Sequence, residues 1–243
     1  MESILVSIIS DQTIPNLLII KELTGQYHSQ LFITTEKMEE AGKSLWIERA
    51  AGIESGSIKR IVVDENNWID INEKLVNFNW PADSSFLVNL TGGTKVMTLA
   101  VYEYFSVPGN KIIYTPIGRN AYEELYPSKT IKAVPFRTRL SVFEYLAAHG
   151  VRIICKESVR KTYNELKTIF KLYKTKGYDI TRLNRGYPAE WKNYFTGEWF
   201  EEYLYFRIKK ELNLTDNFIL MGIELMHFDE ARTSGNDQEL DII

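Results

Sequence analysis

The chain has 243 residues, of which 44% are apolar, and this is enough to build a substantial hydrophobic core. The net charge of −3 excludes a protein that is basic all over, and the single cysteine, Cys155, excludes a disulfide framework within the chain. No uncharged apolar run is long enough to span a bilayer, and the first residues show no basic n-region or cleavage site of the kind that predicts a signal peptide. We therefore expect a cytoplasmic protein with no membrane partner.

The charge is distributed in three blocks. Residues 1–135 carry 12 basic and 16 acidic side chains, residues 136–185 carry 12 basic and 4 acidic ones, and residues 186–243 carry 5 basic and 12 acidic ones. Such blocks indicate segments with different partners, although a lysine-rich solvated helical face is the simpler interpretation of the middle block.

Apolar strands alternate with helices over the first block. We expect strands at residues 4–9, 31–35, 58–63, 85–90 and 111–115, a hairpin over 121–134, and helices at 15–24, 38–51, 68–78 and 95–105. Strands that are apolar throughout and alternate with helices predict a mostly parallel sheet covered on both faces. The fold class predicted is therefore α/β, with a doubly wound, Rossmann-like domain at the N-terminus.

Two polar loops follow predicted strands of this sheet, where ligands bind in such folds. One is Ser10-Asp11-Gln12-Thr13 with Asn16, and the other runs from Asn89 to Lys95 with the sequence NLTGGTK. The second loop offers glycines for close backbone approach, N–H groups at a helix start, hydroxyls and an ammonium, which suit phosphate or ribose. It matches neither a Walker A loop nor a dinucleotide fingerprint. A tight turn whose glycines serve geometry alone remains the alternative.

These two motifs together resemble the CRISPR-associated Rossmann fold (CARF) domain, in the subgroup fused to a restriction-endonuclease-like nuclease. The resemblance covers about residues 1–135 and implies a homodimer that binds a cyclic oligoadenylate, most simply cyclic tetra-adenylate, across its two-fold axis. The ligand-binding residues that it implies are Ser10, Asp11, Gln12, Thr13, Asn16, Thr91, Gly92, Gly93, Thr94, Lys95 and Met97. For Met97, core packing is an equally good interpretation.

The basic middle block is expected to hold a helix over 140–149, a strand over 151–155 and a helix over 158–174 that Ser158 caps. We expect a basic helical or winged-helix-like linker over residues 136–195. Basic side chains interleaved with tyrosines suit contact with a nucleic-acid backbone and its bases. The candidates are Arg152, Lys156, Arg160, Lys161, Lys167 and Lys171. A plain connector between two domains is the alternative.

Residues 196–243 place two carboxylates in a recognisable order. A helix over 196–212 carries Glu201 at the edge of its apolar face, while Glu202 projects away from that face. A strand over 218–226 and a polar turn follow, and Asp241 interrupts the apolar last strand. This order resembles the first half of a PD-(D/E)XK nuclease, which implies that Glu201 and Asp241 are catalytic ligands of Mn²⁺ or Mg²⁺. The alternative is that these two carboxylates form ordinary buried ion pairs.

The Glu-x-Lys half of that nuclease motif is absent, because the chain ends at Ile243 directly after the Asp strand. We expect a longer protein, with a nuclease-dead sensor as the alternative. The preferred function is a metal-dependent nuclease of type III CRISPR defence that cuts DNA or RNA when its activator binds. Two further hypotheses are a CARF-type transcriptional regulator that binds DNA through the linker, and a ring nuclease that degrades cyclic oligoadenylate in the Rossmann pocket.

Overall fold

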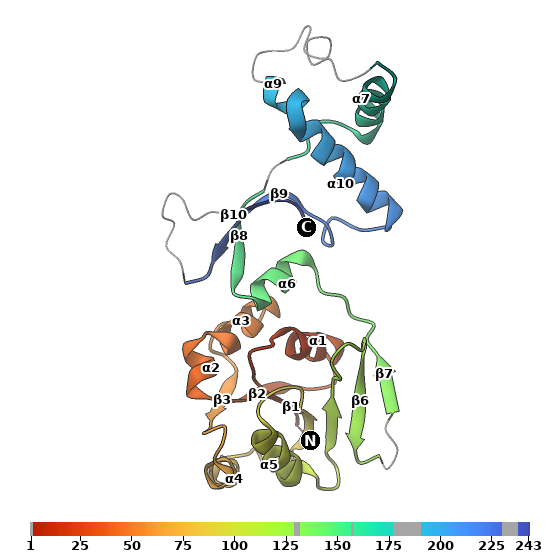
Figure 1. The fold of residues 1–243 in the computed structure, drawn as a ribbon. Helices are drawn as coiled ribbons and strands as arrows, with labels where there is room; N and C mark the ends of the chain where they lie inside the picture. Colours follow the sequence, from red (N-terminus) through yellow and green to blue (C-terminus); the bar gives the residue numbers. More distant parts are fainter. Residues whose placement is uncertain (1, 129–131, 157, 177–190, 230–237) are drawn as a thin grey trace. The chain divides into compact units, whose positions relative to one another are not determined.

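The computed structural model describes residues 2–128, 132–156, 158–176, 191–229 and 238–243. The chain divides into two compact units (Figure 1). The first unit comprises residues 1–140 and 144–150, and the second comprises residues 141–143 and 151–243. Within the described part of the chain, no helix is long and apolar enough to cross a membrane.

The first unit is built on a seven-stranded sheet with the order β3-β2-β1-β4-β5-β6-β7. Its strands are β1 (Ser3–Ile8), β2 (Ser29–Thr34), β3 (Lys59–Val62), β4 (Ser85–Asn89), β5 (Lys111–Tyr114), β6 (Ala121–Tyr126) and β7 (Lys132–Pro135). The first five strands pair in parallel, whereas β6 and β7 add an antiparallel hairpin at one edge. The predicted α/β fold with a mainly parallel, doubly wound sheet is therefore confirmed.

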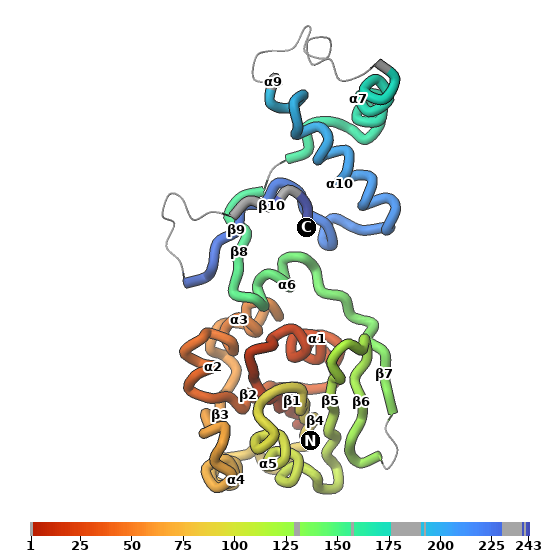
Figure 2. Tube along the Cα trace, viewed as in Figure 1, coloured from red at the N-terminus to blue at the C-terminus, as the bar shows by residue number. Residues whose placement is uncertain are grey.

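Helices cover both faces of this sheet, as the tube in Figure 2 also shows. The covering helices are α1 (Ile14–Glu22), α2 (Glu36–Glu40), α3 (Lys43–Ala50), α4 (Trp68–Asn77) and α5 (Lys95–Phe105). Helix α6 (Val142–Ala148) instead packs against α1 and α3. Alternate residues of β1 supply the two cores, because successive side chains of a strand point to opposite faces. Val6 packs with α4 and α5 on one face, and Leu5 packs with α1, α2 and α3 on the other.

One predicted helix is wrong in its extent. The segment expected as a single helix over 38–51 forms two helices, α2 and α3, which Gly42 separates. Gly42 adopts a φ of 70°, in the left-handed region where glycine carries no steric penalty, so the chain turns sharply there. Both short helices still pack in the core on the Leu5 face of the sheet, through Met38 and Ile47.

The second unit combines a small antiparallel sheet with helices. The sheet has the order β10-β9-β8, from β8 (Val151–Lys156), β9 (Met221–His227) and β10 (Gln238–Ile242). The helical segments are α7 (Tyr163–Lys176), α9 (Trp191–Asn193), a π-helical turn η1 (Tyr194–Glu198) and α10 (Trp199–Glu211). Aromatic residues of α7, η1 and α10 form one core, and α10 packs against β9 and β10 through a second. The sheet thus joins β8, which was predicted in the linker, to strands predicted beyond residue 195, and the predicted boundary there stays a prediction.

The start of α7 differs from the sequence-based expectation. The helix begins at Tyr163 rather than at the predicted cap Ser158. Thr162 and Glu165 form a reciprocal capping box: Glu165 Oε2 accepts from the backbone N–H of Thr162 at 2.8 Å, and Thr162 Oγ1 accepts from that of Glu165 at 3.4 Å.

Candidate functional site

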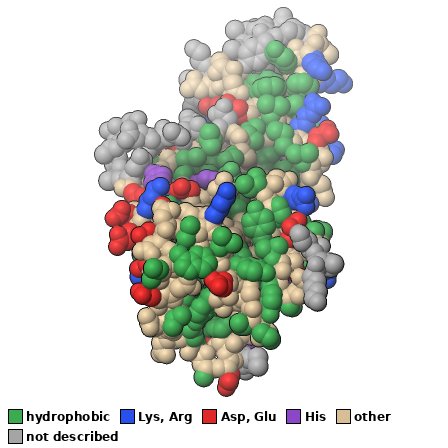
Figure 3. Space-filling model, turned by 60° about the horizontal axis from the view of Figure 1, so that its bottom comes forward, with side chains coloured by type: hydrophobic (Ala, Val, Ile, Leu, Met, Phe, Trp, Pro, Cys, Tyr) green, Lys and Arg blue, Asp and Glu red, His purple; other side chains and the backbone are tan. Residues whose placement is uncertain are grey.

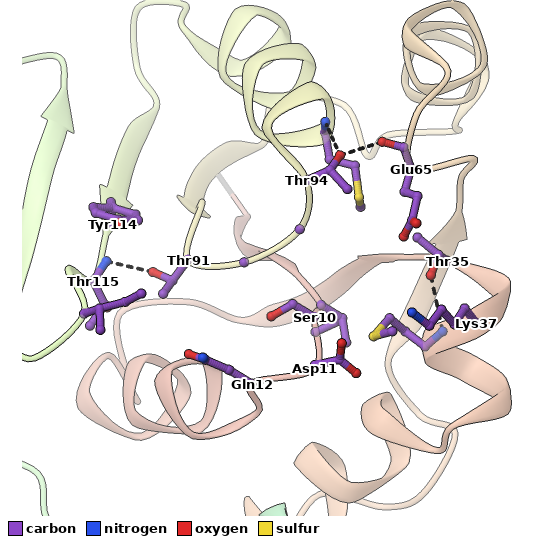
Figure 4. A pocket seen from close by; sticks show the side chains of 16 residues that line it. Ser10, Asp11, Gln12, Thr35, Lys37, Glu65, Thr91, Thr94, Tyr114 and Thr115 are labelled. Atoms are coloured by element: carbon purple, nitrogen blue, oxygen red, sulfur yellow. Dashed lines mark hydrogen bonds between the residues drawn. The ribbon is translucent and has the colours of Figure 1, made fainter.

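A cavity of about 440 Å³ lies at the carboxyl ends of the parallel strands of the first unit. It opens where β1 and β4 are neighbours, which is the point at which the strand order reverses direction. Figure 4 shows Thr35 and Lys37 on one side of it and Tyr114 and Thr115 on the opposite side. Its lining residues are Ile9, Ser10, Asp11, Gln12, Thr35, Lys37, Met38, Glu65, Thr91, Gly92, Gly93, Thr94, Met97, Tyr114, Thr115 and Ile117.

Side-chain amides and hydroxyls connect the strand ends beneath this cavity. Asn16 Nδ2 donates to the carbonyl of Ile8 at 3.0 Å, and Asn16 Oδ1 accepts from Asn89 Nδ2 at 2.7 Å. Asn89 Oδ1 accepts from the N–H of Thr91 at 3.0 Å, and Thr91 Oγ1 accepts from the N–H of Thr115 at 2.8 Å. Because Asn16 and Asn89 are fully buried, this chain of bonds fixes the ends of β1, β4 and β5 relative to one another.

The two glycines of the second loop allow it to pass against the end of β1. Gly92 and Gly93 have φ values of 144° and 72°, which disfavour any side chain. A Cβ at Gly93 would lie 2.6 Å from Cγ2 of Ile8, and one at Gly92 would lie 2.9 Å from the carbonyl oxygen of Ile8. The glycines therefore serve the local geometry, and the same geometry exposes backbone at the cavity.

Thr94 caps the helix that starts at the cavity. Its Oγ1 accepts from the N–H of Met97 at 3.3 Å and donates to the backbone carbonyl of Glu65 at 2.5 Å. The N-terminus of α5 is thereby held at the cavity wall, where its partial positive charge favours an anion. The lining also carries the ammonium of Lys37 and the carboxylates of Asp11 and Glu65, so the cavity can receive both acceptors and donors.

Eight of the eleven predicted ligand-binding residues line this cavity, namely Ser10, Asp11, Gln12, Thr91, Gly92, Gly93, Thr94 and Met97. Met97 also belongs to the core, as the packing interpretation predicts, and its contact with a ligand stays a prediction. The other three lie elsewhere. Thr13 is buried and donates to the carbonyl of Ala148, Asn16 belongs to the buried network, and Lys95 is exposed on the first turn of α5. Whether any of the eleven contacts a ligand stays a prediction.

Five polar lining residues were not among the predicted ones: Thr35, Lys37, Glu65, Tyr114 and Thr115. Each lies at or just beyond the end of β2, β3 or β5. The signal was available, because the carboxyl ends of all parallel strands meet at one edge of a sheet. Extending the two-loop pattern to every predicted strand end would have found them.

In the second unit, the buried carboxylate of α10 belongs to Glu202, which is only 3% exposed, while Glu201 is partly exposed. The expectation that Glu202 projects away from the packed face is thus wrong. Its oxygens accept from the N–H of Arg160 at 2.7 Å, the N–H of Lys161 at 3.3 Å and the hydroxyl of Tyr194 at 2.7 Å. The segment before α7 covers that side of α10, which a projection of α10 alone does not reveal.

The interaction with Glu202 also affects Tyr194, which is fully buried. Burial raises the pKa of the Tyr194 hydroxyl well above its ordinary value, and the hydrogen bond to Glu202 and the charge of that carboxylate raise it further. The hydroxyl consequently remains a proton donor to Glu202 over the physiological range.

Glu201 lines a separate cavity of about 400 Å³ together with Tyr173, Thr196, Gly197, Trp199 and Phe200. Asp241 belongs to β10, and the structure describes its backbone but not its side chain. Among the described residues there is no group of three His, Cys, Asp or Glu side chains that could hold a metal ion. The described residues therefore do not by themselves form a metal centre, and the metal-binding role of Glu201 and Asp241 stays a prediction.

The predicted nucleic-acid contacts fall into two groups. Arg160 forms an ion pair with Glu198 at 2.7 Å, and Lys161 lies 4.9 Å from the Trp191 ring with its side chain largely covered, so both serve contacts within the unit. The others, Arg152, Lys156, Lys167 and Lys171, are exposed. Figure 3 shows Lys and Arg side chains along one edge of the second unit. The predicted basic stretch beyond residue 176 lies outside the described residues until residue 191.

Comparisons with known proteins match the first unit with a family model and nearly the whole chain with solved structures. The family model of the Card1 CARF domain matches residues 4–145. Can2 from Sulfobacillus thermosulfidooxidans, solved in complex with cyclic tetra-adenylate, superposes with a TM-score of 0.70 at 20% identity, over 98% of this chain and 75% of its own. Protein VC1899 from Vibrio cholerae gives 0.74 at 14% identity, over 99% of this chain and 76% of its own.

A third solved structure is a type III CRISPR defence DNA nuclease activated by cyclic oligoadenylate. It gives a TM-score of 0.64 at 16% identity, over all of this chain and 38% of its own. At identities this low, the three superpositions show a shared fold alone. Among curated proteins, none matches this chain.

Proposed function

The chain belongs to the Card1 CARF domain family, and from that premise we propose that its first unit senses a cyclic oligoadenylate and that its second unit is part of a nuclease that this ligand activates. The observation that carries the proposal is the cavity at the reversal point of the sheet, which both polar loops line. The complex of the similarly folded Can2 with cyclic tetra-adenylate supports the same ligand class.

The chemistry of the cavity suits a phosphate-linked ring of adenosines. Backbone N–H groups at the start of α5, exposed by Gly92 and Gly93, and the ammonium of Lys37 suit phosphate oxygens. The carboxylates of Asp11 and Glu65 accept hydrogen bonds, so they suit ribose hydroxyls or the exocyclic amine of adenine. A two-fold dimer would present two copies of these loops to a ring with matching symmetry.

Titration of the chain with cyclic tetra-adenylate by isothermal calorimetry tests the sensor. We expect Lys37→Ala and Gln12→Ala to weaken binding, because both side chains line the cavity. Lys59→Ala, at the amino end of β3 and therefore at the opposite edge of the sheet, is the matched control and should bind as the wild type does. Absence of binding by the wild type would exclude the sensor function.

The nuclease part of the proposal rests on Glu201 and Asp241, with Mn²⁺ or Mg²⁺ as the ion that their oxygen ligands favour. The ion would supply an activated water for phosphodiester hydrolysis. Single-stranded DNA and RNA should be cut only in the presence of both the metal and cyclic tetra-adenylate. In the complete protein, with the expected Glu-x-Lys strand, Glu201→Gln should lose cleavage and still bind the activator, whereas persistent lack of cleavage by a complete wild type that binds activator would refute the nuclease.

The proposed division of labour assigns the sensor to residues 1–135, the basic linker to residues 136–195 and the nuclease segment to residues 196–243. Activator binding can switch the nuclease only if the ligand binds the cleaving arrangement more tightly than the resting one. A homodimer is the assembly that we propose for this switch, and exposed apolar side chains on α4 and α5 support it.

A further inference from the structure

The second cavity, beside Glu201, has an unusual lining for a protein surface. Three of its six lining residues are aromatic, contributed by the end of α7 and the start of α10. Trp199 is buried and closes one wall, while Tyr173 and Phe200 remain 43% and 42% exposed at the rim. The volume of about 400 Å³ falls in the range of small-ligand sites. Exposed rings around a cavity of this size favour a flat, partly apolar occupant.

The charges around the cavity are separated by sign. Lys167, Lys171 and Lys174 recur at i, i+4 and i+7 along α7, so they form one exposed stripe beside the aromatic face of that helix. The Lys174 ammonium lies 5.1 Å from the centre of the Phe170 ring, which keeps it next to this aromatic face. The cavity itself contains the carboxylate of Glu201. Phosphates are therefore attracted to the helix outside the cavity and repelled from its interior.

We propose that this cavity binds one nucleobase of a single-stranded nucleic acid, with Tyr173 and Phe200 stacking on the base while the lysine stripe of α7 neutralises the phosphates beside it. This inference rests on the proposed nuclease function and adds to it a site for one base of the substrate. An unpaired base can enter the cavity, whereas a base in a duplex is held inside its own stack. The site would position the nucleotide next to Glu201, which we propose as a ligand of the catalytic ion.

Binding without cleavage provides the test. The full chain is titrated into fluorescently labelled 12-mers of single-stranded DNA, single-stranded RNA and duplex DNA in the presence of a metal chelator, with and without cyclic tetra-adenylate. Anisotropy gives the affinity. We expect Tyr173→Ala and Phe200→Ala each to weaken binding by about 5- to 150-fold, the usual effect of losing one base–aromatic stack. Tyr173→Phe and Phe200→Tyr keep a ring and should restore affinity to near the wild-type value.

Two matched controls separate stacking from charge and from folding. Leu172→Ala removes an exposed apolar side chain of α7 that does not line the cavity, and it should leave the affinity unchanged. Lys171→Ala should weaken binding at low salt and reduce its salt dependence, because it removes a phosphate contact and no stacking surface. Thermal unfolding of each variant reports its folding.

The results of this experiment distinguish failure of the base site from failure of the proposed function. Single-strand binding that survives both alanine substitutions, or duplex bound as tightly as single strands, overturns the base site while leaving the nuclease proposal intact. No binding of any single strand by the wild type overturns the base site and the nucleic-acid part of the proposed function together. Loss in the alanine variants with rescue by the ring-retaining variants supports the base site.

Discussion

Glycine at position 93 is required at the residue scale for two independent reasons. Its φ of 72° costs a side chain roughly 1–2 kcal/mol, and a Cβ there would also lie 2.6 Å from Cγ2 of Ile8. We therefore expect Gly93→Ala to lower the free energy of unfolding by about 2–4 kcal/mol. It should also displace the loop that lines the cavity and so weaken binding of cyclic tetra-adenylate.

A variant at a second glycine separates the cost of the positive φ from the cost of the close approach to Ile8. Gly56 has a similar φ of 80°, and a Cβ there would have no neighbour within 4 Å. Gly56→Ala should therefore show the conformational cost alone, with ligand binding retained. Urea unfolding and calorimetric titration of both variants provide the measurement. Equal losses of stability in the two would contradict the close-approach argument.

Glu202 is the residue whose removal should most weaken the second unit. Its buried carboxylate accepts two backbone N–H bonds from the segment before α7 and one from the Tyr194 hydroxyl. Hydrogen bonds to a charged acceptor contribute about 1.5–3 kcal/mol each, so Glu202→Ala should cost on the order of 3 kcal/mol after relaxation. Glu211→Ala, at an exposed position of the same helix, should cost little. Chemical unfolding that gave equal effects for both would disprove this role.

The structure brings together those predicted ligand-binding residues whose sequence pattern was local. The loop after β1 and the loop after β4 each show their polar residues as a contiguous run, and the parallel sheet brings both runs to one cavity. The burial of Glu202 depends on Arg160 and Lys161, which lie about 40 residues earlier and cover the far side of α10. No periodicity within α10 carries that information, so the helical projection placed this carboxylate wrongly.

At the scale of elements, alternation of apolar strands with helices was enough to predict the sheet of the first unit, because each element must bury its own apolar face. Ends of helices were less predictable. Gly42 divides a segment whose apolar pattern is continuous, and the capping box of Thr162 and Glu165 begins α7 later than Ser158 would. Both positions carry a recognisable residue type, but several nearby residues carry one as well.

The π-helical turn η1 gives the second unit a dependence on alkaline pH. Burial, reinforced by Glu202, raises the pKa of Tyr194 in the folded state above that of a free tyrosine, which is about 10. The contribution of Tyr194 to the free energy of unfolding is thus fully present below about pH 10. It declines above that pH, because the unfolded chain then releases the Tyr194 proton that the folded chain retains.

Phenylalanine at position 194 removes the titrating hydroxyl. We expect Tyr194→Phe to be less stable than the wild type at pH 8, because Glu202 loses a donor. The difference should shrink as the pH rises to about 11, because only the wild type pays the growing cost of keeping that hydroxyl protonated. Urea unfolding midpoints at the two pH values measure this. A stability difference between the wild type and Tyr194→Phe that stays constant would argue against a raised pKa of Tyr194.

At the scale of the whole molecule, the proposed homodimer needs a surface on the first unit. Adjacent helices α4 and α5 expose Ile69 and Val76, and Leu99 and Tyr102, respectively. Figure 3 shows hydrophobic side chains spread over the visible face of that unit. Several exposed apolar side chains on two neighbouring helices are typical of an interface between protein copies.

Leu99→Glu introduces a charge into that surface at a side chain that is 60% exposed, so the monomer should fold normally. Buried between two protomers, a pair of such carboxylates would be unpaired and would repel each other, and the chain should therefore become monomeric in light scattering. Leu212→Glu, at an equally exposed leucine of the second unit, should remain dimeric.

If a ring ligand bridges two protomers, the Leu99→Glu monomer should also bind cyclic tetra-adenylate at least tenfold more weakly, because half of the contacting loops are missing. Tight binding by a proven monomer would mean that one protomer's cavity holds the whole ligand, and the dimer would then be unnecessary for sensing.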